Sequence, residues 1–300
     1  IVDAVLPDGS RLSAIGEPVT DKLVLVIRKH REAAFQLMDF VNTEVQVRDQ
    51  IEAHEIPDYI GNEVPGSLMS GPVATYLHLC VLAGLNILVI GRTGVGKTAM
   101  LSALGRIIPE NRRVLVLEDT RELNIRDSNC AYLTSVQKVL EGGVEVSMQE
   151  LIITALRQRP DHLILGEARG AEIYDQLNAM QTGHGGYLTS SHANSLADLP
   201  QRVNAMLFQA GANMDNDRVC ALLGTSFHVG IVLRQSLDDG RRYIQEIGEF
   251  TGKVEKRRPV INPIALGGPE RNFHLEPVAK KSSFEEEFRS NGLSFSICVP

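Results

Sequence analysis

The segment from Gly91 to Thr98, with the sequence GRTGVGKT, constrains the fold of this chain more than any other feature. It matches the pattern GxxxxGK[ST] in full, follows the apolar run of residues 87–90 and precedes a helix-like segment at residues 99–105. Between a strand and a helix, such a loop turns its backbone N–H groups towards a bound anion, and the helix N-terminus adds its positive end. The sequence therefore predicts a nucleoside triphosphate site, with Lys97 on the β- and γ-phosphates and Thr98 on Mg²⁺. The residues predicted to hold the nucleotide here are Gly91, Arg92, Thr93, Gly94, Val95, Gly96, Lys97, Thr98 and Ala99.

Strand-like and helix-like segments alternate on both sides of this loop. We expect strands at residues 86–90, 113–117, 161–165, 186–191 and 227–233, and helices at residues 73–82, 99–105, 149–158 and 198–208. This alternation predicts an α/β fold in which a parallel sheet is covered by helices on both faces.

Glycine and proline residues divide the chain into segments. The stretch from Pro57 to Pro72 contains six of them, and we place a linker at residues 61–72 and a nucleotide-binding domain at residues 73–250. Residues 1–60 are strand-like and then helix-like, and they are interpreted as the C-terminal part of an N-terminal domain. Because the chain starts at Ile1 directly in strand-like sequence, we expect that an N-terminal piece precedes it. Residues 251–300 are expected to be an irregular appendage of unknown role.

Composition narrows the function classes. The chain has 300 residues, 43% of them apolar, with a formal net charge of -7 and a pI near 5.7, so it lacks the basic balance typical of a nucleic-acid binder. No apolar run approaches the roughly 20 residues that span a bilayer. The cysteines Cys80, Cys130, Cys220 and Cys298 form no CxxC pair, so neither a zinc site nor a redox motif is indicated, and free thiols suit a reducing compartment.

Carboxylates follow the second expected strand. Glu118, Asp119 and Glu122 come after the apolar residues 114–117, and the C-terminal ends of parallel strands are where such sheets bind ligands. They are candidates for activating water and for binding the metal ion or its water ligands. A solvated strand end with a helix-capping aspartate explains the same residues equally well.

The third strand ends in Gly166 and Glu167, an apolar run closed by an acid as in a Walker B motif. We expect Glu167 to contact Mg²⁺ through water or to position the attacking water. Arg157, Arg159 and Arg169 flank this strand, and guanidinium groups stabilise charge on a transferring phosphoryl group, in cis or from a neighbouring subunit. Ordinary surface ion pairing is the expected role of at least one of these arginines.

Two histidines stand eight residues apart, at His184 after a turn and at His192 after an extended segment. A histidine near a γ-phosphate is able to sense its presence. Taken alone, each is more often a structural residue. No cysteine or third histidine lies close by, which argues against zinc.

Four segments, in this order, resemble the secretion traffic ATPases of type II secretion, type IV secretion and type IV pili, in particular the CpaF-like branch of tight-adherence pili. They are Gly91–Thr98, Leu117–Leu123, Leu156–Gly170 and Thr182–Ser195. Residues 230–249 and 7–28 are similar to the closing strands of the family and to its N-terminal domain, so the resemblance covers about residues 1–250. The usual family residues are replaced at five positions: Arg92, Val95, Gly185, Ser190 and Ser191.

The resemblance implies a RecA-like P-loop ATPase domain with a smaller α/β N-terminal domain, truncated here. It implies ATP and Mg²⁺ as cofactors, with Glu122 as catalytic base, Glu167 as Walker B acid, and Thr98, Glu118 and Glu167 around the metal. The further catalytic residues expected are Lys97, His184, His192, Arg157 and Arg169, with the histidines coupling the γ-phosphate to domain movement. Arg28, and with less support Arg11 and Arg31, are expected to reach the nucleotide from the N-terminal domain.

The resemblance also implies an assembly and a location. A homohexamer would hold nucleotide between the two domains of each subunit and drive a bacterial secretion or pilus machine. The chain would be cytoplasmic and peripheral at the inner membrane, docked on an inner-membrane component, with no nucleic acid expected.

Other readings of the P-loop stay open. A RecA-like nucleic-acid translocase or helicase predicts a basic channel, and a small-molecule kinase predicts an acceptor pocket that the sequence does not reveal. A GTPase is disfavoured because no N-K-x-D motif occurs. A non-catalytic regulator is disfavoured because each expected acid is present.

Overall fold

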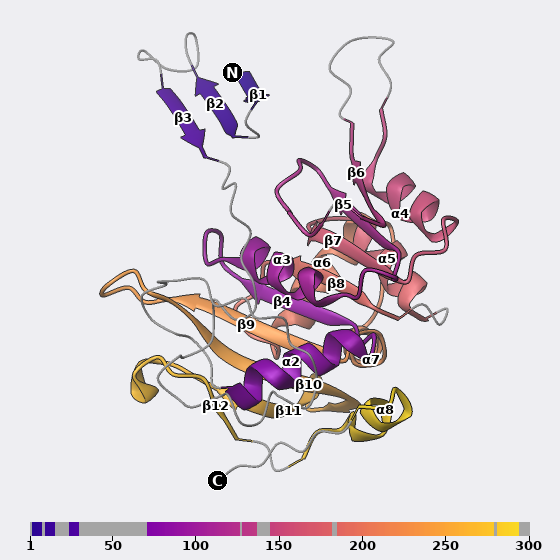
Figure 1. Cartoon of the computed structure of the whole chain (residues 1–300), viewed down its shortest axis with the longest axis vertical. Helices are drawn as coiled ribbons and strands as arrows, with labels where there is room; N and C mark the ends of the chain where they lie inside the picture. The colour runs from indigo at the N-terminus through magenta and orange to yellow at the C-terminus, as the bar shows by residue number, and fades with distance from the viewer. Residues whose placement is uncertain are drawn as a thin grey trace.

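The computed structural model describes residues 2–7, 10–15, 24–29, 71–126, 128–136, 145–181, 185–278 and 281–293. These residues form two sheets (Figure 1). The smaller sheet is antiparallel in the order β1-β2-β3, with β1 at Val2–Val5, β2 at Arg11–Ile15 and β3 at Val24–Arg28. The strands expected within residues 1–30 are therefore present.

The larger sheet has nine strands in the order β12-β11-β10-β9-β4-β8-β7-β5-β6. Its strands are β4 (Ile87–Gly91), β5 (Val114–Glu118), β6 (Cys130–Thr134), β7 (His162–Ala168), β8 (Tyr187–Ser191), β9 (Val229–Gln235), β10 (Arg242–Glu255), β11 (Arg258–Leu266) and β12 (Glu276–Pro277). Every residue of β4, β5 and β8 is buried, as expected for parallel strands covered on both sides.

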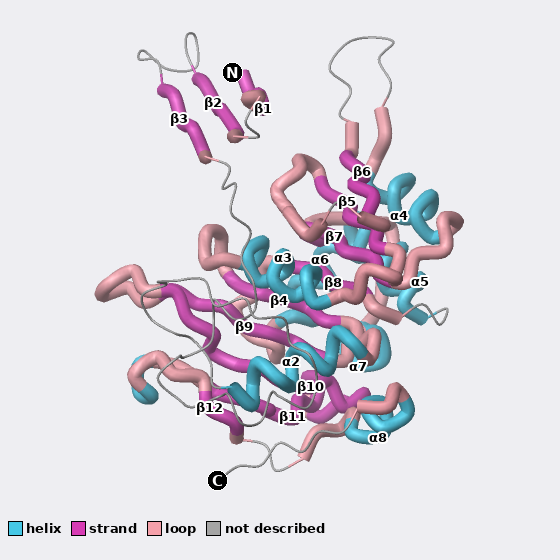
Figure 2. The backbone as a smooth tube through the Cα atoms, in the orientation of Figure 1, coloured by secondary structure: helices cyan, strands magenta, loops and turns pink. Residues whose placement is uncertain are grey.

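Helices cover both faces of this sheet (Figure 2). On one face lie α2 (Gly71–Leu82) and α3 (Lys97–Ile107), which pack on Ile87 and Val89. On the other lie α4 (Met148–Leu156), α5 (Glu172–Gln181), α6 (Leu199–Gln209) and α7 (Asn216–Ser226), over Leu88 and Ile90. Successive strand residues point to opposite faces, so one apolar run serves both cores. A short helix, α8 (Glu285–Ser290), joins the α2 side.

The predicted α/β fold is confirmed, but the sheet is only partly parallel. The run from β6 through β5, β7, β8 and β4 to β9 is parallel, whereas β10, β11 and β12 add antiparallel strands beside β9. The helices α5 and α7 and the strand β6 were not predicted. Residues 61–70 of the proposed linker lie outside the described residues, and residues 71–72 begin α2.

The prediction that residues 251–300 are irregular is wrong for the part of this segment that the structure describes. Strand β10 runs past residue 250 to Glu255 and pairs with β11, so the proposed boundary falls inside a strand. The two residues between these strands, Lys256 and Arg257, have φ of 49° and 61°. Such positive φ angles in a two-residue hairpin are usually supplied by Asn-Gly or Asp-Gly, and the turn lacks that signal here.

Among the described residues, no helix combines the length and apolar character that crossing a bilayer requires.

Candidate nucleotide-binding site

The glycine-rich loop joins the end of β4 to the start of α3, as the sequence predicted. Gly94 has φ of 80° and Gly96 has φ of 104°, which L side chains adopt only with strain. Gly96 caps α3, so the first free N–H groups of that helix open at the loop. Positive φ and open N–H groups are the two requirements of an anion-binding loop.

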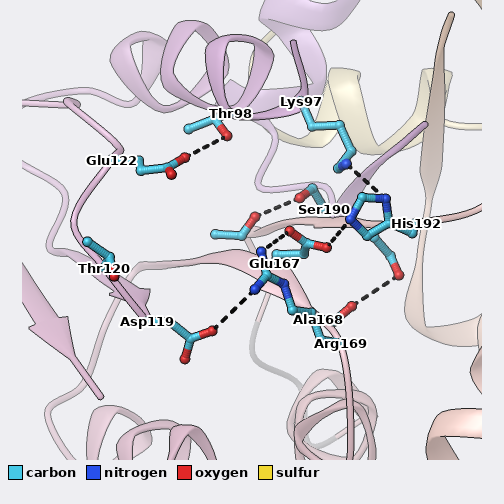
Figure 3. A network of polar contacts seen from close by, with 12 residues as sticks. Lys97, Thr98, Asp119, Thr120, Glu122, Glu167, Ala168, Arg169, Ser190 and His192 are labelled. Atoms are coloured by element: carbon cyan, nitrogen blue, oxygen red, sulfur yellow. Dashed lines mark hydrogen bonds and ion pairs between the residues drawn. The ribbon is translucent and has the colours of Figure 1, made fainter. Parts of the chain in front are cut away.

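Lys97 is folded back over this loop. Its side chain is buried, and its Nζ donates hydrogen bonds to the carbonyl oxygens of Gly91 at 3.2 Å and Arg92 at 3.3 Å. The same Nζ lies 3.3 Å from Nδ1 of His192 (Figure 3). The ammonium group is thus held where phosphate oxygens would meet it.

His192 connects Lys97 to Glu167. Its Nε2 lies 2.6 Å from Oε1 of Glu167, while its Nδ1 faces Lys97. An ammonium group has no acceptor, so Nδ1 must be the unprotonated nitrogen and the ring proton sits on Nε2, facing the carboxylate. Partial burial and the charge of Lys97 lower the pKa of His192, which agrees with a neutral ring.

Glu167 lies near the end of β7 between two partners. Besides His192, its Oε2 accepts a hydrogen bond of 2.8 Å from Arg169, whose other nitrogen lies 4.0 Å from Asp119. Burial alone would raise the pKa of Glu167, but the hydrogen bond and charge of Arg169, with His192 and Lys97 nearby, lower it. The carboxylate is therefore ionised near neutral pH.

A local irregularity in β7 sets the direction of Glu167. Leu165 pairs with Thr189 and Ala168 with Ser191, so one extra residue of β7 bulges between these pairs. The hydroxyls of Ser190 and Ser191 donate to the carbonyl oxygens of Gly166 at 2.6 Å and of Ala168 at 3.2 Å. This positioning role of the two serines was not predicted from the sequence. The signal was the pair of small hydroxyl residues directly before His192.

Glu122 faces the loop from the segment that follows β5. The Thr98 hydroxyl donates to Oε2 of Glu122 at 3.4 Å, and Arg11 of β2 lies 3.2 Å from Oε1. Arg11 also donates to the carbonyl oxygen of Thr120 at 3.4 Å. A residue of the small sheet therefore contacts the acidic segment directly.

Glu118 is placed differently from the other acids. It is 7% exposed, and its carboxylate accepts hydrogen bonds from the backbone N–H groups of Glu122 and Leu123. Burial raises its pKa to about 7, although these two hydrogen bonds oppose the rise. Its oxygens are directed to the protein backbone.

The structure does not bring every predicted residue to this site. Arg157 caps the C-terminus of α4, before β7 begins, and Glu167 lies five residues into that strand, about 16 Å further along. Arg157 and Arg159 are thus at the opposite edge of the sheet. The sequence order already indicated this, because both arginines precede the expected strand and such sheets bind ligands at the C-terminal ends of their strands. A contribution from a neighbouring subunit stays a prediction.

Three further predicted groups lie outside the described part of the chain: His184, Arg31 and the side chain of Arg28. The backbone of Arg28 ends β3 and pairs with Arg11.

No group of three or more His, Cys, Asp or Glu side chains with metal-binding geometry occurs among the described residues. The oxygen atoms near the loop, the Thr98 hydroxyl and the Glu122 and Glu167 carboxylates, are nevertheless of the kind that Mg²⁺ prefers. Mg²⁺ is usually held by one or two protein oxygens together with substrate phosphates, so a small protein ligand set is compatible with it.

The fold and these residues match a known family. Residues 70–247, more than half of the chain, match the family model described as "Type II/IV secretion system protein". The chain belongs to this family. The predicted resemblance to secretion traffic ATPases is therefore confirmed.

Individual members of the type II/IV secretion family are similar over different lengths. The putative conjugal transfer protein Rv3659c of Mycobacterium tuberculosis is 37% identical over 179 residues, 58% of this chain and 50% of the relative. PtlH of the Bordetella pertussis type IV secretion system is 32% identical, covering 70% of this chain and 62% of PtlH. VirB11 of Bartonella quintana is 27% identical, covering 82% and 72%. The chain thus spans about half the length of the mycobacterial relatives.

Solved structures in this family share the fold. The VirB11 ATPase from the Brucella suis type IV secretion system, crystallised with sulphate, superimposes with a TM-score of 0.53 at 25% identity, covering 83% of this chain and 73% of VirB11. The Legionella pneumophila ATPase DotB gives a TM-score of 0.52 at 19% identity, covering 85% and 63%. The RecA-like architecture expected from the sequence is that of a secretion ATPase.

Proposed function

We propose that the chain binds and hydrolyses ATP and works as one subunit of a ring-shaped motor in a secretion or pilus machine. The observation that carries the proposal is the convergence of Lys97, Thr98, Glu122, Glu167 and His192 around one glycine-rich loop. These side chains come from four elements, α3, the segment after β5, β7 and the end of β8.

The loop and Lys97 would hold the triphosphate. Backbone N–H groups at Gly94, Gly96 and the start of α3 supply neutral donors, and Lys97 supplies a positive charge. Its present partners are carbonyl oxygens at 3.2 and 3.3 Å, which are weaker acceptors than phosphate oxygens. Nucleotide binding would therefore draw the ammonium group from them.

Mg²⁺ would be held by the Thr98 hydroxyl and by Glu167, and when bound it neutralises charge on the phosphates. Glu122 is the proposed base, which orients or deprotonates the attacking water. Its carboxylate already contacts Thr98, so it reaches the edge of the loop where a γ-phosphate would lie. Arg169 supports Glu167 through their 2.8 Å hydrogen bond.

His192 is the proposed sensor of the γ-phosphate. It touches Lys97 on one side and Glu167 on the other, so a movement of Lys97 onto phosphate changes both contacts. Arg11 would link the proposed base Glu122 to the small sheet. Repeated contact changes of this kind move domains relative to each other.

Family membership supports the rest of the proposal. We propose a homohexamer in the cytoplasm, peripheral at the inner membrane and docked on a membrane component of the machine.

Steady-state ATPase assays test the chemistry. Lys97→Ala and Glu167→Gln should each lower turnover by roughly 100-fold or more, because the first removes the positive charge that meets the phosphates and the second removes the charge of a proposed Mg²⁺ ligand. Lys253→Ala, an exposed lysine on β10, is the control and should keep wild-type turnover. Undiminished turnover in both site variants would rule out this proposal.

Light scattering on the same preparations tests the ring. With Mg²⁺ and a non-hydrolysable ATP analogue, the mass should approach six times 32.9 kDa. A protein that remains monomeric at every nucleotide and protein concentration tried would contradict the hexamer.

A further inference from the structure

The acidic segment after β5 contains a carboxylate that the proposed chemistry does not use. Glu118 ends β5 and is 7% exposed. Its Oε1 accepts N–H hydrogen bonds from Glu122 at 3.1 Å and Leu123 at 3.0 Å, and its Oε2 accepts one from Leu123 at 3.2 Å. We propose that Glu118 is a positioning residue, which grips the backbone at residues 122 and 123 and thereby aims Glu122 at the glycine-rich loop.

The space for this carboxylate exists because residue 166 is a glycine. A Cβ atom at Gly166 would lie 3.0 Å from Cγ of Glu118 and 3.4 Å from its Oε1. The first of these distances is closer than carbon atoms normally pack. The aspartate that many P-loop enzymes have at this place would therefore require Glu118 to shift by a few tenths of an ångström. The missing side chain of Gly166 on β7 thus leaves room for the side chain of Glu118 on β5.

The hydrogen bonds to Glu118 hold the backbone of Glu122, the proposed base. Glu122 offers its own backbone N–H to Glu118, while its side chain receives the Thr98 hydroxyl at 3.4 Å. A grip on the backbone of Glu122 therefore restricts where its carboxylate can point. The neighbouring Leu123 is 1% exposed and anchors the same turn in the core.

The far end of the segment has a separate anchor. The hydroxyl of Tyr132 on β6 accepts N–H hydrogen bonds from Ile125 at 3.0 Å and Arg126 at 3.3 Å. Tyr132 thus holds residues 125 and 126, and Glu118 holds residues 122 and 123. Loss of Glu118 should loosen the segment where Glu122 sits and leave the other end in place.

The sequence suggested metal binding as the role of Glu118, and the structure supports a positioning role instead. Both oxygens of Glu118 accept backbone hydrogen bonds and the side chain is 7% exposed, so the carboxylate is held against the backbone of residues 122 and 123. The inference rests on the proposed function, since Glu122 is the proposed base.

Kinetics of Glu118→Gln distinguish the two roles. Glutamine keeps the size but replaces one acceptor oxygen by an NH₂ group, which cannot accept an N–H. We expect kcat to fall on the order of 10- to 100-fold, as for a misplaced catalytic group, while KM for ATP and the Mg²⁺ requirement stay near wild type. A variant that loses Mg²⁺ affinity instead, or one with wild-type kcat, would overturn the proposal.

A double-mutant cycle tests whether Glu118 acts through Glu122. In a Glu122→Gln background, adding Glu118→Gln should change kcat by less than about twofold, because residues acting as one unit are not additive. Full additivity would contradict the inference. Glu118→Asp, which keeps the charge but shortens the reach, should behave like Glu118→Gln and serves if the glutamine variant folds poorly.

Hydrogen exchange provides a readout that does not depend on ATP hydrolysis. In Glu118→Gln, the peptide spanning residues 119–124 should exchange faster, and the peptide around Tyr132 should not. Glu249→Gln is the matched control, since Glu249 is also a buried strand glutamate that accepts a backbone N–H, from Ser283 at 2.7 Å. It should lower stability but leave kcat and exchange at residues 119–124 unchanged.

Failure of the proposed ATPase function and failure of the proposed role of Glu118 give different results. Faster exchange in Glu118→Gln together with no ATPase activity in the wild type would refute the proposed function and leave the grip of Glu118 intact. Unchanged exchange at residues 119–124 would refute the inference even if the chain hydrolyses ATP.

Discussion

At the scale of single residues, the protonation state of His192 decides which partner each of its ring nitrogens can contact. Lys97 must donate to Nδ1, so Nε2 carries the proton that faces Glu167. A neutral ring accepts from Lys97 at Nδ1 and turns its Nε2–H towards Glu167, whereas a protonated ring would repel Lys97. The lowered pKa of His192 keeps the neutral form populated at physiological pH.

Substitution of His192 tests whether its contacts with Lys97 and Glu167 matter for turnover. Glutamine can accept from Lys97 through its oxygen and donate to Glu167 through its NH₂ group, but alanine can do neither. We expect His192→Ala to lower kcat by about tenfold or more, and His192→Gln to recover most of it. Nucleotide affinity, measured by calorimetry, should change little in either variant. Equal losses in both would indicate that the proton-carrying imidazolium is needed.

At the scale of elements, the C-terminal segment is held by one buried carboxylate. Glu249 on β10 is fully buried and accepts hydrogen bonds from Tyr76 of α2, Asn262 of β11 and the hydroxyl of Ser282. The chain beyond β12 is thereby tied to α2 and β10. Beside this network, Phe288 of α8 packs edge-on against Tyr76, with ring centroids 6.2 Å apart.

Removal of one ring tests whether α8 belongs to the cooperative core. Phe288 is 0% exposed, so Phe288→Ala should lower the free energy of unfolding by about 3–5 kcal/mol. Phe208→Ala on α6 is the control, because Phe208 is 73% exposed and its loss should cost less than about 0.5 kcal/mol. Urea unfolding measures both. Similar stabilities of the two variants would mean that α8 unfolds apart from the domain.

At the scale of the whole molecule, buried ionisable groups make stability depend on pH. Burial lowers the pKa of His162, at the start of β7, to about 4, and the charges of Arg112 and Arg126 act in the same direction. A hydrogen bond to Gly186 and the charge of Asp161 oppose this shift. The unfolded chain therefore binds a proton at this residue more readily than the folded one, and stability should fall as pH drops from about 6.5 to about 4. Glu118 has the opposite effect on stability. Because its pKa is raised to about 7 in the folded chain, its contribution to stability is lost as pH rises.

The acid side of this dependence can be isolated with His162→Gln. Glutamine does not titrate and keeps a donor towards Gly186, whose carbonyl oxygen lies 3.2 Å from Nδ1 of His162. Between pH 7 and pH 4, the wild type should lose about 3 kcal/mol more unfolding free energy than the variant. Chemical unfolding at several pH values measures this difference. Parallel curves of unfolding free energy against pH for the two proteins would show that the pKa of His162 is the same in the folded and unfolded chain.

Local patterns in the sequence predicted the glycine-rich loop, its flanking β4 and α3, and the acids Glu122 and Glu167. Each depends on a few adjacent residues, since apolar runs form buried strands and glycines permit positive φ. The order of four motifs was enough to identify the family. Conversely, the hairpin of β10 and β11 has no turn signal in Lys256 and Arg257, so its sequence looked irregular.

Only the tertiary structure decided which groups each acid contacts. Glu118 and Glu122 stand four positions apart in one acidic segment, yet one is buried on backbone N–H groups and the other faces Thr98. Such contacts join segments far apart in the chain, as between Tyr76 and Glu249, and no local pattern encodes them because they depend on how the strands pair and the helices pack.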